Sequence, residues 1–366
     1  MAKLKYYSLD AILAKNAHYS MIIGERSNGK TTAVLSYILE QYVKHGSAAA
    51  YVRRYEDDVK GSRGDAVWSG ILQLGILEKL TGGAWTNIIY KGRAWYLAVP
   101  DPEKDGRFIL DDRPFCHAFA LTLQERYKGN SYPDIRTVMF DEFMTRTGYL
   151  HDEFVIFMNL LSTIIRQRDD VRIFMCGNTV SKYCPYFTEM GLDHIKDMEK
   201  GSIDIYSYGQ SRLRVAVEFA DFPSKQKPSD VYFAFNNPQL QMITGQGGVW
   251  EMALYPHCPT KIKPKDIVYT YFIRFDGDLL QCEIVNDEQG VFTFIHRKTT
   301  DLQDPDQDLV FTPDYDIRPN WRRRITEPQD RIGRKIAEFY DQDRVYYQDN
   351  QVGEIVRNYF LWCRTA

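Results

Sequence analysis

The sequence has few features of a secreted or membrane protein. Its apolar runs are far shorter than the roughly 20 residues that a membrane span requires. Residues 1–20 lack a continuous apolar core, so we expect no signal peptide. The six cysteines are scattered without a CxxC pair, a pattern that is wrong for zinc and unlike a disulfide framework. We therefore expect free thiols, a reducing cytoplasm and no membrane partner.

The sequence also lacks the large positive charge of many nucleic-acid-binding proteins. Its formal net charge at pH 7 is −3, so any contact with phosphates must come from local basic patches. One such patch runs from Arg318 to Lys335, where seven basic residues stand against two acidic ones. A solvated, charged helix surface is the alternative interpretation. The candidate nucleic-acid contacts in this patch are Arg322, Arg323, Arg324, Arg331 and Lys335.

The chain is long enough for two domains. Its 366 residues are 44% hydrophobic and 26% charged, which is the composition of a globular protein. In the first half, apolar strands alternate with helix-like segments, and this order predicts an α/β fold with a doubly wound, mainly parallel sheet. The predicted strands lie at 20–23, 48–55, 137–140 and 172–176, and the predicted helices at 30–44 and 152–168.

The second half has a different character. Six prolines between Pro223 and Pro264 are typical of a linker with short irregular elements. Three β-rich runs, separated by turns that contain glycine, then predict an antiparallel meander. These runs cover 267–275, 279–285 and 291–297, and two helical segments at 329–340 and 351–363 follow. We expect a first domain at 1–223, a linker at 224–257 and a smaller α+β domain at 258–366.

The segment GERSNGKT fits the pattern GxxxxGK[ST] at every fixed position. Its glycines allow backbone N–H groups to turn toward phosphate oxygens, at the positive end of the following helix. Lys30 would reach the terminal phosphates of ATP, and Thr31 would hold Mg²⁺. A simple glycine turn is the alternative, but the strand before it and the helix after it favour a nucleotide site. The candidate nucleotide-binding residues are Gly24, Ser27, Asn28, Gly29, Lys30, Thr31 and Thr32.

Two adjacent carboxylates, Asp141 and Glu142, end the predicted strand TVMF. Asp141 would bind Mg²⁺, and Glu142 would orient and polarise the attacking water. A small-molecule kinase brings its own nucleophile and needs no such base, so Glu142 favours an ATPase. Two carboxylates that only cap a turn are the alternative.

Three further polar residues are candidates for nucleotide sensing and catalysis. Asn178 ends the next strand and could sense the γ-phosphate, although asparagine is also common in turns. Arg166 is a candidate arginine finger for a neighbouring subunit, but a cation at a helix C-terminus, like Arg168 beside it, also complements the helix dipole. Lys128 is a second candidate trans-acting residue, and a solvated loop lysine is its alternative.

Taken together, these segments resemble the packaging ATPases of small podoviruses, the phi-twenty-nine-like phages. The resemblance is carried, in order, by GERSNGKT, YVRRY, NSYPDIRTVMFDEF and RQRDDVRIFMCGN, and it covers most of the first predicted domain. It implies an ASCE/RecA-like P-loop ATPase domain, a linker and an RNase H-like domain. By position, Arg166 matches the trans-acting arginine of that family and Lys128 its candidate trans-acting lysine.

The resemblance also implies a function. Members are ATP- and Mg²⁺-dependent motors that move double-stranded viral DNA into an empty prohead. The resemblance implies that they form rings, expected to be pentamers, which dock on the portal vertex. Such a protein works in the host cytoplasm and binds the prohead transiently, and whether a structural RNA takes part stays open. An active RNase H-like nuclease needs a carboxylate inside its first strand, but VYTYFIRF has none. We therefore expect a vestigial nuclease that binds nucleic acid or the prohead without cutting DNA.

Three other functions share part of this pattern. A RecA-like helicase or another nucleic-acid-dependent ATPase has the same motifs, and strand displacement without a prohead would identify it. A small-molecule kinase is disfavoured by Glu142 and by the lack of an arginine-rich lid between the motifs. A scaffold that uses nucleotide only as a switch would show no steady-state ATP turnover.

Overall fold

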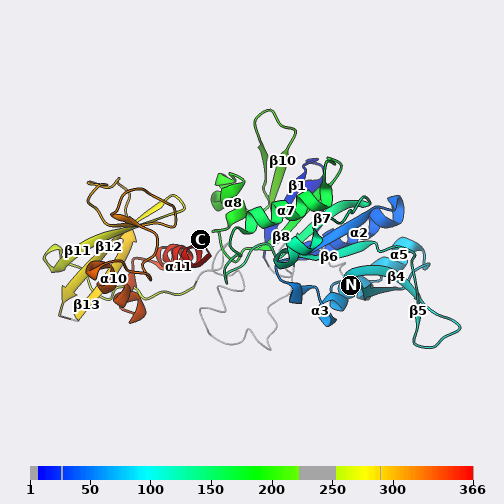
Figure 1. Ribbon diagram of the computed structural model, residues 1–366, viewed down its shortest axis with the longest axis horizontal. Coiled ribbons are helices and arrows are strands. Elements are labelled where there is room, and N and C mark those ends of the chain that lie inside the picture. The colour runs from blue at the N-terminus through cyan, green and yellow to red at the C-terminus, as the bar shows by residue number, and fades with distance from the viewer. Residues whose placement is uncertain (1–6, 26–27, 222–252, 289, 366) are drawn as a thin grey trace. The chain divides into compact units, whose positions relative to one another are not determined.

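The computed structural model describes residues 7–25, 28–221, 253–288 and 290–365 (Figure 1). The chain divides into two compact units. Unit 1 contains Met1–Thr145 and Glu153–Ser229, and unit 2 contains Arg146–Asp152 and Asp230–Ala366. The short segment Arg146–Asp152 therefore groups with the C-terminal half. The predicted linker at 224–257 lies, as far as residue 252, outside the described residues.

A large mixed sheet forms the centre of unit 1. Its strands are β1 (Tyr19–Gly24), β2 (Ala48–Arg53), β3 (Asn87–Lys91), β4 (Ala94–Pro100), β5 (Phe108–Leu110), β6 (Cys116–Ala120), β7 (Ile135–Asp141), β8 (Arg172–Asn178), β9 (Ile203–Ser207) and β10 (Arg214–Phe219). They follow the order β3-β4-β6-β2-β7-β8-β1-β10-β9, with β5 paired to β4. From β6 to β10 all neighbours are parallel, and antiparallel pairs occur only toward the two edges. The predicted α/β fold with a mainly parallel sheet is confirmed.

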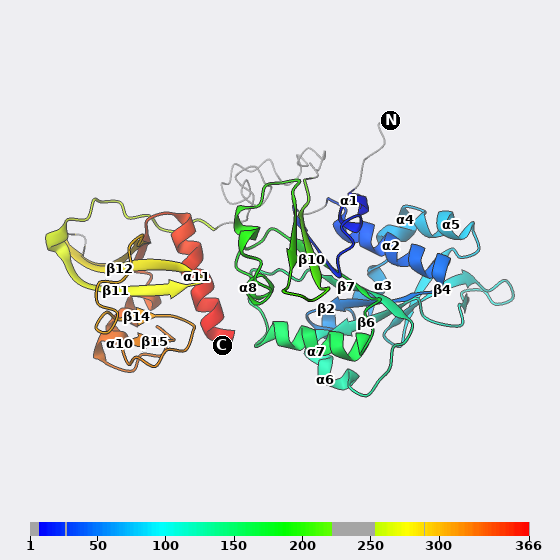
Figure 2. The same ribbon diagram turned by 90° about the horizontal axis from the view of Figure 1, so that it is seen from above.

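Helices cover both faces of this sheet. Figure 2 shows α2, α4 and α5 on one face and α6 and α7 on the other. The helical spacing of apolar residues predicts that Phe157, Leu161 and Ile164 face the sheet; helix α7 buries these three, and Leu160 as well. The helices of unit 1 are α1 (Asp10–Leu13), α2 (Lys30–His45), α3 (Ser62–Ala66), α4 (Ser69–Gln73), α5 (Ile76–Thr81), α6 (Gln124–Tyr127), α7 (Glu153–Ile165) and α8 (Pro185–Glu189).

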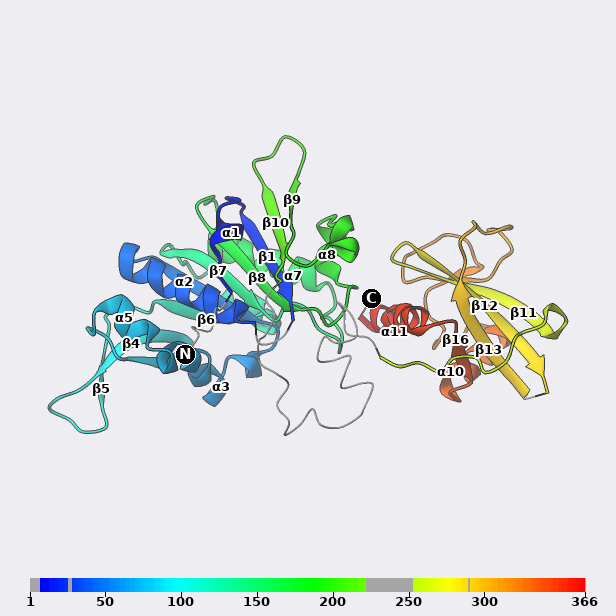
Figure 3. The ribbon, with the colours of Figure 1, turned by 180° about the vertical axis from the view of Figure 1, so that it is seen from behind.

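The antiparallel edges of the sheet are not predicted by the sequence pattern. Strands β3, β4 and β5 form one edge, and β9 pairs with β10 at the other. Figure 3 shows that the hairpin of β9 and β10 extends beyond the neighbouring strands. Because β10 also pairs in parallel with β1, this hairpin is anchored directly beside the GERSNGKT segment.

Unit 2 contains a second, smaller mixed sheet, in the order β15-β14-β11-β12-β13-β16. The predicted meander is confirmed, because β11, β12 and β13 are antiparallel neighbours. Asp276 and Gly277 both have positive φ angles, 51° and 83°, as a two-residue hairpin turn requires. The elements are β11 (Ile267–Phe275), β12 (Asp278–Asp287), β13 (Gly290–Arg297), β14 (Val310–Phe311), β15 (Trp321–Arg322), β16 (Val345–Tyr347), α10 (Arg331–Asp341) and α11 (Asn350–Thr365).

The two predicted C-terminal helices correspond to α10 and α11. Asp330 caps α10, because its carboxylate accepts a hydrogen bond from the backbone N–H of Gly333 at 2.7 Å. In the described part of the chain, we find no helix with the length and apolar character that crossing a membrane requires.

Close packing of α11 gives a stability prediction. A Cβ at Gly353 would lie 2.2 Å from Cγ of Tyr255, so the aromatic ring would have to move. Overpacking of this kind costs about 1–3 kcal/mol, and Gly353→Ala should therefore lower the melting temperature measured by circular dichroism. Gly70→Ala in α4 is the control, since a Cβ there meets nothing within 4 Å and alanine favours a helix. An unchanged melting temperature for Gly353→Ala would contradict this packing.

Candidate nucleotide site

Three of the predicted motifs meet at the carboxyl ends of the central parallel strands of the large sheet. Gly24 ends β1, Asp141 ends β7 and Asn178 ends β8. Strand β8 lies between β7 and β1, all three are parallel, and Gly24 and Asn178 are partners in register. Ligands of open α/β sheets bind beyond the carboxyl ends of the strands. The fold therefore gathers the predicted phosphate, metal and sensor residues where a nucleotide would bind.

Lys30, the first residue of α2, is buried among oxygen acceptors. Its Nζ donates to the carbonyl oxygens of Gly24 (3.2 Å) and Glu25 (2.7 Å). It also donates to Oδ1 of Asn28 (3.0 Å) and of Asn178 (3.3 Å). Within the described residues, Lys30 forms no ion pair with a carboxylate. Burial lowers the pKa of Lys30 to about 8, since desolvation disfavours the charged ammonium.

The loop before Lys30 fits an anionic ligand such as a phosphate. Among the residues that the structure describes, the buried Nδ2 atom of Asn28 has no hydrogen-bond acceptor, and a phosphate oxygen could supply one. Gly29 has a φ of 90°, a left-handed conformation that glycine adopts without steric cost. A phosphate would give the buried ammonium of Lys30 a direct ion pair and the Nδ2 atom of Asn28 an acceptor, neither of which the described residues provide. Thr32 lies in the first turn of α2, and Ser27 lies outside the described residues.

The carboxylate of Asp141 is buried between two hydroxyl groups. Its Oδ1 accepts a hydrogen bond from Oγ1 of Thr31 and its Oδ2 accepts one from the hydroxyl of Tyr51, both at 3.0 Å. Burial raises the pKa of Asp141, while Arg53 nearby opposes the shift. Thr31 and Asp141 thus bring together two oxygen atoms that could act as metal ligands, and Mg²⁺ prefers oxygen ligands. The residues fit the metal that the sequence pattern implies.

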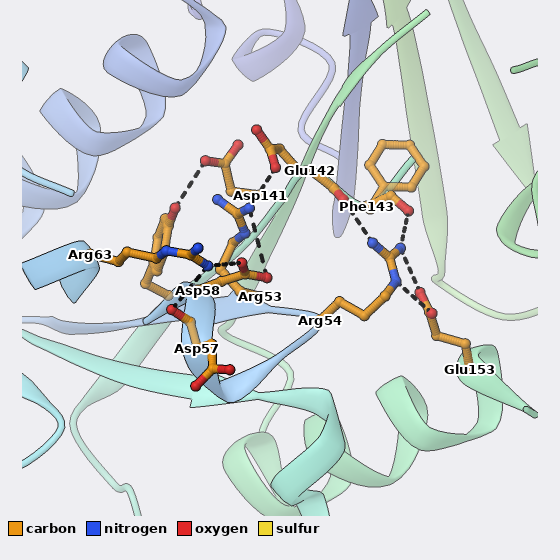
Figure 4. A network of polar contacts seen from close by, with 10 residues as sticks. Arg53, Arg54, Asp57, Asp58, Arg63, Asp141, Glu142, Phe143 and Glu153 are labelled. Carbon is orange, nitrogen blue, oxygen red and sulfur yellow. Dashed lines mark hydrogen bonds and ion pairs between the residues drawn. The ribbon is translucent and has the colours of Figure 1, made fainter. Parts of the chain in front are cut away.

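Glu142 follows β7 in a left-handed conformation, with φ of 55°. Its side chain is 55% exposed, and its Oε2 accepts a hydrogen bond from Nη2 of Arg53 at 2.5 Å (Figure 4). Exposed ion pairs contribute about 0–1 kcal/mol, so a small rearrangement would free the carboxylate. Sequence reasoning did not predict this contact.

Arg54, beside Arg53, forms a buried network that sequence reasoning also missed. Its guanidinium pairs with both carboxylate oxygens of Glu153, at 2.7 and 2.8 Å, and donates to the carbonyl oxygens of Phe143 (2.7 Å) and Glu142 (3.3 Å) (Figure 4). The only signal in the sequence is a pair of arginines at the end of an otherwise apolar strand.

The structure separates the two arginines at the end of α7. Arg168 donates to the carbonyl oxygens of Ile164 and Ile165 in the last turn of α7, which is a helix-capping role. Arg166 instead donates to the carbonyl oxygen of Asn130 at 2.6 Å and is exposed. Lys128, two residues from Asn130, is exposed and pairs with Glu125. Both predicted trans-acting residues therefore belong to one exposed region.

This region lies at the amino ends of the parallel strands, whereas the GERSNGKT segment lies at their carboxyl ends. Arg168 donates to the carbonyl oxygen of Ile135, the first residue of β7, at 2.6 Å. The region is therefore near the amino end of β7, whereas Asp141 is at its carboxyl end. A side chain there is remote from Lys30 and Asp141 of the same chain.

The predicted basic patch of unit 2 is partly neutralised within the unit. Arg322 pairs with Asp330 and Arg324 pairs with Glu327, both at 2.6 Å. The Nε atom of Arg323 donates to the carbonyl oxygen of Pro313 at 3.0 Å. Charge counting along the sequence could not reveal these pairs. The other two candidates, Arg331 and Lys335, are exposed on α10.

The family to which these motifs belong is shown by comparison with known proteins. A model of the family described as "Podovirus DNA encapsidation protein (Gp16)" matches residues 1–63 and 99–229, more than half of the chain. This chain belongs to that family. The matched residues contain every predicted nucleotide, metal and catalytic position, whereas the basic patch at 318–335 lies outside them.

The DNA packaging protein of Bacillus phage phi29 is 28% identical over 206 residues, which cover 55% of this chain and 54% of the relative. The chain thus spans about half the length of the curated relatives it matches. The bacteriophage Phi-29 viral genome packaging motor assembly matches with a TM-score of 0.55 and 19% identity, over 98% of this chain and 99% of that one. The Phi-28 gp11 DNA packaging motor matches with a TM-score of 0.53 and 18% identity, over 97% and 98%. At these identities the solved structures share the fold.

The lowered pKa of Lys30 gives a prediction for nucleotide binding. The negative phosphates of ATP should raise this pKa, because they favour the charged ammonium. With a pKa of about 8 in the free protein, Lys30 is already mostly protonated at pH 7 but mostly neutral at pH 9. When ATP binds at pH 9, Lys30 should take up roughly nine-tenths of a proton from solution. At pH 7 it should take up far less, because it is already mostly protonated. Calorimetry in two buffers of different ionisation enthalpy measures this uptake.

Lys30→Arg is the control, because a guanidinium stays charged at pH 9. ATP binding to this variant should take up little proton at either pH. An uptake at pH 9 that persists in Lys30→Arg, or that is absent from the wild type, would contradict the assignment to Lys30.

Proposed function

We propose that this chain is the ATPase of a motor that moves double-stranded viral DNA into an empty prohead. The observation that carries the proposal is the convergence of Lys30, Thr31, Asp141 and Asn178 at one sheet edge, in a member of the podovirus DNA encapsidation family. The phi29 relative, a DNA packaging protein, supports the same function.

In this proposal the first unit is an ASCE-type P-loop ATPase domain. Lys30 binds the terminal phosphates of ATP, and the loop from Gly24 through Ser27, Asn28 and Gly29 to Thr32 surrounds the phosphate chain. Thr31 and Asp141 hold Mg²⁺, which neutralises phosphate charge when it is bound.

Glu142 orients and polarises the attacking water once Arg53 releases its carboxylate. Asn178 senses the γ-phosphate, because its Oδ1 is bonded to the same Lys30 ammonium that would contact that phosphate. New contacts between Lys30 and phosphate would therefore change the hydrogen bond that Asn178 accepts from Lys30 at the end of β8.

Arg166 and Lys128 act on the nucleotide of the neighbouring subunit. Their exposure, and the contact of Arg166 with the loop that carries Lys128, support a shared role at a subunit interface. The chains assemble into a ring, which we expect from the family resemblance to be a pentamer. This ring docks on the portal of the prohead in the host cytoplasm.

The second unit is a vestigial RNase H-like domain, preceded by a linker, that binds nucleic acid or the prohead without cutting DNA. Its antiparallel meander followed by helices supports this fold. Because Arg322 and Arg324 are ion-paired, we expect Arg331 and Lys335 to contribute most to the proposed contact with phosphates, with Arg323 between these extremes.

Two substitutions at the nucleotide site separate binding from hydrolysis. Lys30→Ala should abolish ATP binding, because the buried cation at the terminal phosphates is lost. Glu142→Gln should bind ATP normally and fail to hydrolyse it, because its shape is kept while the carboxylate is removed. Equilibrium binding of a fluorescent ATP analogue and release of inorganic phosphate measure the two steps. Normal turnover by Glu142→Gln would show that another residue activates the water.

A mixing experiment tests whether Arg166 acts in trans. Arginine fingers contribute roughly 10³- to 10⁵-fold in rate, so Arg166→Ala should bind ATP but scarcely hydrolyse it. An Arg166→Ala subunit keeps its own Lys30 and Glu142, so a Glu142→Gln neighbour that still carries Arg166 should restore its hydrolysis. Two inactive proteins should therefore give a partly active mixture.

Arg168→Ala is the matched control, because Arg168 bonds to carbonyl oxygens of its own helix. Mixing Arg168→Ala with Glu142→Gln should give no more activity than Arg168→Ala has by itself. If the first mixture stays inactive while the two variants demonstrably co-assemble, Arg166 does not act in trans.

A further inference from the structure

One buried guanidinium holds the chain on both sides of the segment that follows β7. Arg54 donates to the carbonyl oxygens of Glu142 and Phe143, immediately after the strand (Figure 4). It also pairs through two hydrogen bonds with Glu153, the first residue of α7. The exposed fractions are 7% for the Arg54 side chain and 0% for that of Glu153, so solvent does not compete for these bonds.

The backbone of Glu142 requires such support. Its φ of 55° lies in the left-handed region, which is unfavourable for a residue with a side chain. On the other side, a Cβ at Gly177 of β8 would lie 2.8 Å from Phe143 and from Met144, so the chain after Glu142 is packed tightly against that strand. The backbone at 142–144 is thus held between β8 and the guanidinium of Arg54.

The same guanidinium is linked to helix α7. Glu153 also accepts a hydrogen bond from the hydroxyl of Tyr186 at 3.0 Å, which fixes its carboxylate. Along α7, Phe157 packs against Phe140 of β7 with ring centroids 5.0 Å apart. Arg166 follows the last residue of α7. The backbone at Glu142 and the helix whose far end precedes Arg166 therefore share the guanidinium of Arg54.

We propose that Arg54 is a positioning residue for Glu142 and that its ion pair with Glu153 couples Glu142 to the helix carrying Arg166. This inference rests on the proposed ATPase function. Arg53 contacts the carboxylate of Glu142, whereas Arg54 contacts its backbone. The carboxylate can therefore leave Arg53 while the Cα stays in place, and hydrolysis depends on that fixed Cα.

The first test separates nucleotide binding from turnover. Arg54→Lys keeps the positive charge but loses the planar fork that reaches three groups, and Glu153→Gln keeps the shape but removes the charge. Both variants should bind ATP within about threefold of the wild type and lose about tenfold or more in kcat. Arg93→Lys is the control, because the exposed Arg93 pairs with the half-buried Glu56 away from Glu142, and this variant should change neither quantity.

A double-mutant cycle distinguishes positioning from a general structural effect. If Arg54 acts through the Glu142 carboxylate, Arg54→Lys should cost little further in the residual single-turnover rate of Glu142→Gln. If the two losses multiply, Arg54 acts independently of Glu142 and the inference is overturned. Equal losses of ATP affinity and kcat in Arg54→Lys would overturn it as well.

A paired substitution covers the case in which the single variants do not fold, because removing one partner leaves a buried unpaired charge. Arg54→Met with Glu153→Leu removes both charges at similar volume and should bind ATP without turning it over. Normal turnover by this protein would overturn the inference and leave the proposed ATPase function intact. A wild-type protein that hydrolyses no ATP would instead refute the proposed function itself.

Discussion

The buried carboxylate of Asp141 organises the candidate nucleotide site of unit 1. Removing a carboxylate from water is unfavourable unless hydrogen bonds and nearby charge compensate. Thr31 from α2 and Tyr51 from β2 supply the hydrogen bonds, and Arg53 supplies the charge. The same contacts join the helix that carries Lys30 to the two strands beside it. The position of the proposed metal ligand Asp141 and the position of α2, which carries Lys30, are therefore set together.

Two neighbouring arginines at the end of β2 have different partners. Arg53 is the last residue of β2, and Arg54 is the first residue after it. Arg53 contacts the carboxylate of Glu142, whereas Arg54 turns to Glu153, the first residue of α7 (Figure 4). The exposed pair is easily broken, whereas the buried pair is costly to break. The proposal therefore has the pair of Arg53 and Glu142 open during turnover, while the pair of Arg54 and Glu153 persists.

The sequence was sufficient for the parts whose signal is local. A glycine-rich loop between a buried strand and a helix, and adjacent carboxylates at a strand end, predicted that Lys30 and Asp141 would lie at the same end of the parallel strands, as they do. It could not predict contacts that depend on the tertiary fold, such as the one between Arg54 and Glu153, which lie 99 residues apart. The same limit explains the missed pairing of β10 with β1, and the basic patch at Arg322, where charge counting ignores the ion pair with Asp330.

The central claim is that ATP hydrolysis at this site moves double-stranded DNA. Its most direct test is protection of DNA from nuclease after incubation with empty proheads and the protein. With ATP the wild type should protect the DNA, whereas a non-hydrolysable ATP analogue, or the Glu142→Gln variant with ATP, should protect none. Protection of the same amount of DNA without hydrolysis, or strand separation in place of protection, would contradict the account.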